Sequence, residues 1–168
     1  MTLSCCRIGR MVAIATLLFV ISWGADQSFG AGAKKMDGWE KDGKYNSYYN
    51  PRELDYFYAW VVKIKSIVPL PGMTPALALE IKEDKDDDES IIAHLCPTWY
   101  MEKQQLALKK GDRVKIKGSW AHINGADVLM VSKIKKGDYY ELKVRLTNDG
   151  TPFWSLTPEE LEKEKRSQ

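Results

Sequence analysis

Apolar and polar residues alternate along several short stretches of this chain, a pattern typical of β-strands that bury one face. In the stretch 76–82, for example, Leu79 and Ile81 fall on one face of the predicted strand, whereas Glu80 falls on the other. The same pattern or a short apolar run predicts six strands, which are residues 56–65, 76–82, 91–96, 113–120, 127–134 and 139–146.

Helix and turn signals lie between and after these strands. Thr98 can cap a short helix from residue 99 to about residue 110, and Gly111 supplies its stop. Asn124 and Gly125 are a strong signal for a tight hairpin turn. Ser155, Thr157 and Pro158 can start a short charged helix near the C-terminus.

The order of these elements predicts a mainly β fold. Three strands, a short helix and two strands follow one another in the order of the five-stranded OB-type Greek-key barrel. The sixth strand and the C-terminal helix extend this unit. We therefore expect one OB-fold domain over residues 55–155, with a charged helix or tail over residues 156–168.

The N-terminus has the layout of a secretory signal peptide. Arg7 and Arg10 precede the apolar run 11–23, and small residues follow this run. We predict a signal peptide over residues 1–30, cleaved near residues 30–33, and a flexible leader over residues 31–54. The alternative is an uncleaved anchor, but the apolar run is shorter than the roughly 18 residues that span a bilayer. Export predicts a periplasmic or secreted protein that meets a membrane only if the signal segment stays uncleaved.

Charge and cysteine content narrow the choice of partners. The formal net charge of the whole chain is +2, and removal of the signal would leave the remainder nearly neutral. Proteins that grip nucleic acid carry a basic excess or stripe, so we expect no nucleic-acid partner. Only Cys96 lies after the signal, so the exported chain cannot form an internal disulfide.

Three motifs resemble a known family. Residues 94–100 read His-Leu-Cys-Pro-Thr-Trp-Tyr, residues 111–119 read Gly-Asp-Arg-Val-Lys-Ile-Lys-Gly-Ser, and residues 150–155 read Gly-Thr-Pro-Phe-Trp-Ser. In order and spacing they resemble the OB-fold domain of the MamS/MamX magnetosome proteins and of other exported bacterial proteins. The family pattern has glycine where this chain has Cys96. The chain also lacks a Cys-x-x-Cys-His motif, so the resemblance does not imply covalent haem.

His94 and Cys96 are candidate ligands of copper or zinc. They lie two residues apart on a predicted strand, so both side chains point to the same face. An imidazole and a thiolate suit either metal, but a complete site needs a further ligand such as His122. The alternative is that His94 is hydrogen-bonded within the barrel and Cys96 is a small buried apolar residue.

Aromatic residues are the candidate binding groups. Trp99, Tyr100, Trp120 and Trp154 can either line a ligand site or plug the barrel end, and for Trp99 and Trp154 plugging is favoured. No nucleophile and base stand at a catalytic spacing, so we expect no enzyme. The sequence thus predicts an exported binding module for an envelope protein or small ligand. The alternatives are metal handling or redox assistance by His94 and Cys96 and, less favoured, single-stranded nucleic-acid binding.

Overall fold

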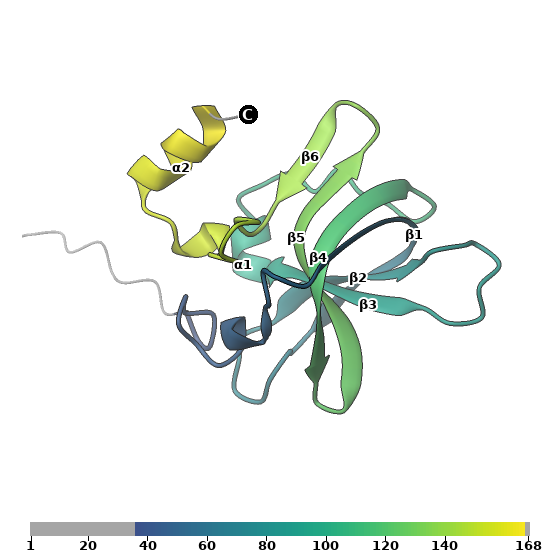
Figure 1. The fold of residues 1–168 in the computed structure, drawn as a ribbon, viewed down its shortest axis with the longest axis horizontal. Coiled ribbons are helices and arrows are strands. Elements are labelled where there is room, and N and C mark those ends of the chain that lie inside the picture. Colours follow the sequence, from purple (N-terminus) through teal and green to yellow (C-terminus); the bar gives the residue numbers. More distant parts are fainter. Residues whose placement is uncertain (1–35, 167–168) are drawn as a thin grey trace, which may run out of the picture. The chain divides into compact units, whose positions relative to one another are not determined.

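The structure is a computed structural model and describes residues 36–166. The signal peptide predicted over residues 1–30 and its cleavage site lie outside these residues. The elements, shown in Figure 1, are η1 (Asn46–Tyr48), β1 (Leu54–Ile67), β2 (Ala76–Lys82), β3 (Ile91–Pro97), α1 (Thr98–Met101), β4 (Arg113–Ile123), β5 (Ala126–Lys136), β6 (Tyr140–Lys143), η2 (Phe153–Ser155) and α2 (Pro158–Arg166).

Five strands close into a ring. β1 pairs antiparallel with β2 on one side and with β4 on the other. β2 in turn pairs antiparallel with β3, and β4 pairs antiparallel with β5. A short parallel pairing of β3 with β5 closes the ring, and β6 adds to the far end of β5. The predicted mainly β, barrel-like fold with an extra strand and a C-terminal helix is confirmed.

Two predictions made from short stretches of sequence, the turn after β4 and the start of the C-terminal helix, agree with the structure. The turn between β4 and β5 consists of Asn124 and Gly125, whose φ angles of +53° and +80° suit the tight turn predicted there. At the start of α2, the Glu160 amide donates to the Thr157 hydroxyl over 3.3 Å, and the Thr157 amide donates to the Glu160 carboxylate over 2.8 Å. This reciprocal capping box explains why the helix begins at Pro158.

A glycine allows the barrel to bend on β4. The pairing of β4 with β5 shifts register between Lys117 and Gly118. A Cβ atom on Gly118 would come within 2.5 Å of the Met130 carbonyl oxygen, so only glycine permits this approach of the two strands. The close approach of the two strands therefore explains the glycine at position 118 in the second motif.

The predicted helix after β3 is much shorter than expected. α1 ends at Met101 instead of continuing to about Lys110. Thr98 does not cap it through its side chain, because its hydroxyl donates to the Pro75 carbonyl. After Met101 the chain is not helical, and Leu108 of this segment packs into the barrel core.

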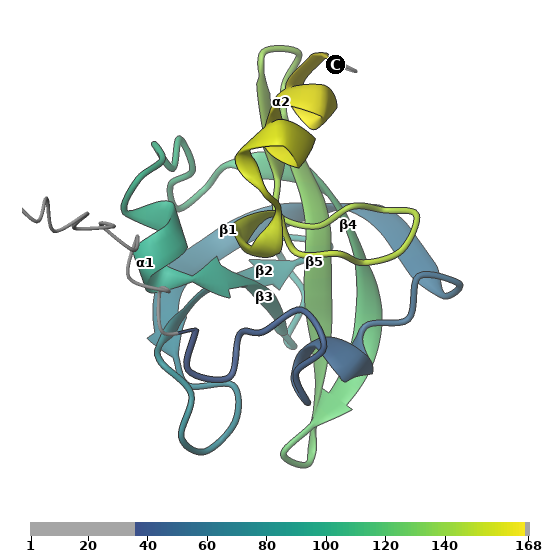
Figure 2. The same cartoon turned by 90° about the vertical axis from the view of Figure 1, so that its left-hand side faces the viewer.

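Residues 36–53, which fall within the leader predicted over residues 31–54, carry buried aromatic side chains. Trp39 and Tyr45 are buried, with exposed fractions of 0% and 1%, and Tyr49 is buried as well. Figure 2 looks onto one side of the barrel and shows this segment together with α1, η2 and α2. Aromatic residues of the segment supply part of the core, so it belongs to the folded unit.

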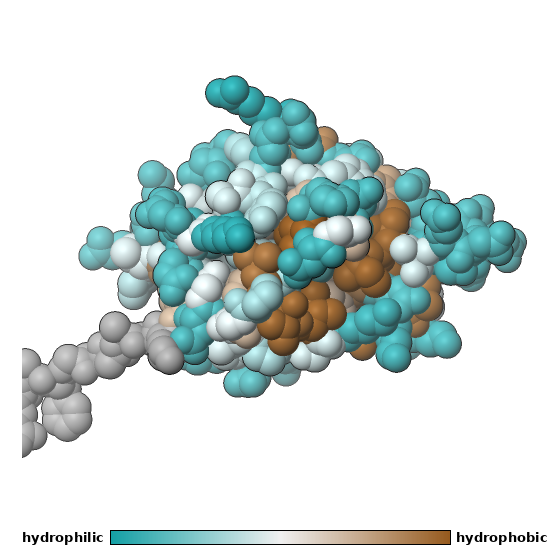
Figure 3. All heavy atoms as spheres, turned by 90° about the horizontal axis from the view of Figure 1, so that it is seen from below, coloured by the Kyte–Doolittle hydropathy of each residue, from teal (hydrophilic) through white to brown (hydrophobic). Residues whose placement is uncertain are grey.

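The β4–β5 turn and the β1–β2 loop lie together at one end of the barrel. The Asn124 side-chain amide donates to the Pro69 carbonyl over 2.8 Å and ties the β4–β5 turn to the β1–β2 loop, in which Val68 is exposed. Seen from the side of this turn, apolar side chains gather in one area framed by hydrophilic ones (Figure 3).

No helix within residues 36–166 is long and apolar enough to cross a membrane.

Candidate functional site

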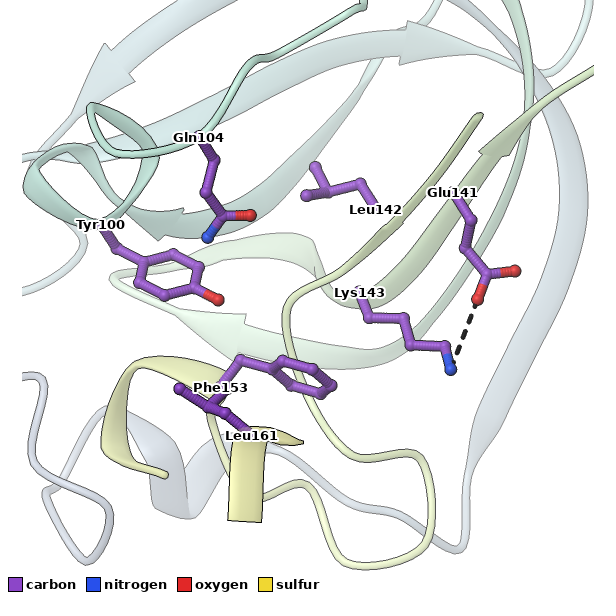
Figure 4. Close-up of a pocket in the computed structure, with 7 residues that line it drawn as sticks. All are labelled: Tyr100, Gln104, Glu141, Leu142, Lys143, Phe153 and Leu161. Atoms are coloured by element: carbon purple, nitrogen blue, oxygen red, sulfur yellow. Dashed lines mark ion pairs between the residues drawn. The ribbon is translucent and has the colours of Figure 1, made fainter. Parts of the chain in front are cut away.

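A pocket of about 390 Å³ lies where four separate segments of the chain meet. Its lining comes from α1 and the loop that follows, from β6, from η2 and from α2, as Figure 4 shows. The lining residues are Tyr100, Gln104, Glu141, Leu142, Lys143, Phe153 and Leu161. Because these residues lie far apart in the sequence, the pocket exists only in the folded chain.

The pocket combines an apolar lining with a few polar groups. Leu142 and Phe153 are largely buried beneath the pocket. The Lys143 ammonium lies 3.5 Å from the Glu141 carboxylate on one side, and Gln104 brings its amide group to the other (Figure 4). Such a mixture of apolar surface and convergent polar groups is typical of small-ligand sites.

The charge state of the polar groups follows from their surroundings. Burial opposes ionisation of Glu141, but the hydrogen bond from Lys135 and the charges of Lys133 and Lys143 outweigh it and lower the pKa of this carboxyl. Burial is the main cause of the raised pKa of Tyr100, whose hydroxyl therefore stays protonated. The pocket thus offers a phenol donor, a carboxylate and an ammonium.

A cluster of aromatic side chains lies directly behind Tyr100. The ring centroids of Tyr100 and Trp154 are 5.8 Å apart, and Trp154 and Trp39 are 5.5 Å apart. The Trp154 indole donates to the Trp39 carbonyl over 2.9 Å. Trp99 contacts the far side of Tyr100, with centroids 6.3 Å apart. Three of the predicted binding residues therefore meet here, where Trp154 plugs the barrel end and Tyr100 also lines the pocket.

Trp120, the fourth aromatic candidate, lies elsewhere. It is on the outer part of β4, 38% exposed, and stacks on Phe57. Its indole donates to the Asp55 carboxylate over 3.1 Å. Trp120 is not among the residues that line the pocket, so it takes no part in this site.

Sequence reasoning missed Arg145, which lies at the centre of the cluster. Its side chain is 1% exposed, and one of its nitrogens donates to the Asn46 side chain over 2.8 Å and to the Gly150 carbonyl over 3.3 Å. The guanidinium also lies 5.0 Å from the Trp154 ring. The one available signal was a single arginine within the apolar end of the sixth predicted strand.

His94 and Cys96 lie beside this cation as uncharged groups. The His94 Nδ1 atom is 3.1 Å from the Tyr45 hydroxyl, and the two rings stack. Burial, together with the positive charge of Arg145, lowers the pKa of His94 to about 4. Burial raises the pKa of Cys96 to about 12, although Arg145 partly opposes the shift. At neutral pH His94 is therefore a neutral imidazole and Cys96 a protonated thiol.

The structure does not assemble the predicted metal ligands. His122 is exposed on β4, where its Nδ1 atom lies 2.8 Å from the Asp127 carboxylate. Within residues 36–166, no three histidine, cysteine, aspartate or glutamate side chains lie close enough together to hold a metal ion. His94 and Cys96 instead match the alternative of buried, structurally used residues.

The sequence of this barrel can now be placed among known proteins. A family model described as the MamS/MamX magnetosome protein family matches residues 57–140, which contain the first two motifs. No curated protein and no solved structure matches the chain. Because residues 57–140 make up half of the 168 residues, the chain belongs to the MamS/MamX magnetosome protein family.

Proposed function

We propose that this chain is a non-enzymatic, exported OB-type binding module of the bacterial cell envelope. It holds a small ligand, or a short segment of an envelope protein, in the pocket beside Tyr100. The observation that carries this proposal is the pocket itself, in which apolar surface and convergent polar groups come from four segments of the chain.

The connectivity of the strands supports the OB assignment. Around the ring the strands follow one another as β1, β2, β3, β5 and β4, with the short helix α1 between β3 and β4. Barrels of this type commonly bind ligands through their open faces and loops. Export is supported by the charged and apolar layout of residues 1–30.

The lining suggests which ligands fit. Leu142, Phe153 and Leu161 suit an aliphatic or aromatic group. The Lys143 ammonium suits a ligand carboxylate, while Gln104 can bond to an amide from either of its two side-chain atoms. A peptide end or an amino-acid derivative combines these features.

A binding role also agrees with the chemistry of the neighbouring residues. A cysteine nucleophile acts as a thiolate, yet burial holds Cys96 in the thiol form, with a pKa of about 12. His94 bonds to Tyr45 through its Nδ1 atom. Neither residue is among those that line the pocket.

The test is an NMR titration of the exported chain with acetylated amino-acid amides and short peptides. We expect shifted amide signals at Tyr100, Gln104 and Lys143. Gln104→Ala and Lys143→Ala should each weaken binding by up to about tenfold, the effect of one lost hydrogen bond or ion pair. Lys44→Ala, an exposed lysine outside the pocket, is the matched control. Binding that persists in both pocket variants, or turnover of a probe, would contradict the proposal.

A further inference from the structure

A second surface of the barrel carries an unusual concentration of positive charge. On the outside of β4, β5 and β6, cationic side chains lie next to one another across the strands. Lys115 pairs with Lys135, Lys117 with Lys133, and Lys133 with Lys143. We call this surface the basic face; its cations are Arg113, Lys115, Lys117, Lys133, Lys135 and Lys143, the last of which also lines the pocket beside Tyr100.

The stability of the sheet does not explain this arrangement. Like charges directly opposite one another on paired strands are destabilising. Glu141 brings a carboxylate among them and lies within 4.0 Å of Lys133, Lys135 and Lys143, and Asp138 lies at the β5–β6 turn beside the β4 cations. No ion pair within residues 36–166 joins Arg113, Lys115 or Lys117 to a carboxylate. Local choices that oppose stability are expected at functional sites.

The basic face is hollowed. A groove of about 440 Å³ lies between the β1 tyrosines and the β5–β6 turn, and Arg113 and Lys115 of β4 line it. Its lining residues are Tyr56, Tyr58, Arg113, Lys115, Lys135, Gly137 and Asp138. A concave, positively charged surface of this kind concentrates anionic partners.

The tyrosines of the groove are already covered by cations. The Lys115 ammonium lies 4.3 Å from the centroid of the Tyr56 ring, and the Arg113 guanidinium lies 4.7 Å from that of Tyr58. A hydrogen bond with Tyr56 is the main cause of the raised pKa of Lys115, which keeps this ammonium charged. Rings occupied in this way are poor platforms for stacked nucleobases, the contact on which single-strand binding relies.

An acidic loop lies beside one end of the same face. Residues 83–89 connect β2 to β3 and contain six acidic residues and Lys85. The Lys85 ammonium lies 3.8 Å from the centroid of the Trp60 ring, and Trp60 pairs with Arg113. A broad anionic surface such as a membrane would contact this acidic loop and be repelled by it. A narrow acidic chain that runs along β4 would not contact the loop.

We infer that the basic face binds an extended acidic polypeptide segment of a partner protein. Arg113, Lys115 and Lys117 are spaced two residues apart on β4, which places their origins about 6.6 Å apart. Carboxylates on alternate residues of an extended peptide have the same spacing. Each can therefore meet one cation of β4, while Lys133 and Lys135 add charge from the side.

Fluorescence anisotropy with a labelled peptide of alternating glutamate and threonine tests this inference. The full exported chain should bind the peptide at low salt and lose it at high salt. Lys115→Gln combined with Lys135→Gln should weaken binding by about tenfold or more. Lys44→Gln combined with Lys163→Gln removes the same charge from exposed positions outside the face and should have little effect.

Two comparison probes separate the other polyanions. A labelled oligothymidylate and vesicles containing phosphatidylglycerol should bind less tightly than the peptide under the same conditions. Tighter binding of either one, or equal loss in the face and control variants, would overturn the inference. Melting temperatures of both double variants show whether each is folded, and a single Lys115→Gln variant repeats the test if the double variant unfolds.

Discussion

The aromatic cluster at the barrel end and the basic face use the same kinds of side chain in opposite ways. In the cluster, Arg145 lies against Trp154 and is 1% exposed. On the basic face, Arg113 lies over Tyr58, which is 51% exposed. Burial at the barrel end holds Arg145 against aromatic rings, Asn46 and the Gly150 carbonyl, while exposure on the face leaves its cations accessible to an outside anion. The first arrangement belongs to the core, and the second is the surface for which we infer an acidic partner.

The largest effect that would sharpen this comparison is expected at Trp39. Trp39→Ala removes a fully buried ring that packs on Tyr45 and Trp154, so the free energy of unfolding should fall by about 3–5 kcal/mol. Urea unfolding of the variant and of the original chain measures this loss of stability. Trp120→Ala is the matched control, because that indole is partly exposed and should lose clearly less. Equal losses would mean that the segment before β1 is not part of the core.

The next effect is a pH dependence that arises from His94. The folded pKa of about 4 lies below the ordinary value of 6.5, so the unfolded chain binds the proton more tightly. Stability should therefore fall as the pH falls below about 6.5, by about 2 kcal/mol between pH 7 and pH 5.

Urea unfolding at both pH values measures this loss. His94→Gln keeps an acceptor for the Tyr45 hydroxyl without a titrating group, and the variant should lose much less stability over the same interval. The lowered pKa of Glu141 moves the titration of this carboxyl in the folded chain further from that interval. A variant as sensitive to pH as the original chain would exclude His94 as the cause.

The smallest effect is expected on the basic face and has the opposite sign. Lys117→Glu replaces a like-charge pair with Lys133 by an opposite-charge pair and should raise the free energy of unfolding by about 0.2–1 kcal/mol. The same change should weaken binding of the acidic peptide. Lys163→Glu on α2 is the control and should leave peptide binding unchanged. A loss of stability in Lys117→Glu would show that the lysine has a structural role.

Prediction from the sequence succeeded where a few neighbouring residues decide the structure. Alternation predicted β2 at residues 76–82, and Asn124 with Gly125 predicted the β4–β5 turn. It failed for α1, because Thr98 bonds to Pro75 of another loop and the chain after Met101 packs Leu108 into the core from a segment that is not helical. Of the candidate site, Tyr100 was identified, but Gln104 and Lys143 carry no local signal of their own.

The sequence alone determined the strands, the tight turn between β4 and β5, the start of α2 and the family motifs. Each of these depends on residues close together in the chain. Only the tertiary structure decided that Trp39 and Arg145 belong to the core, and that His122 lies apart from His94 and Cys96. It also decided that a chain of nearly balanced charge carries one strongly basic face. Composition and periodicity do not record which distant strands become neighbours, and that pairing sets burial and local charge.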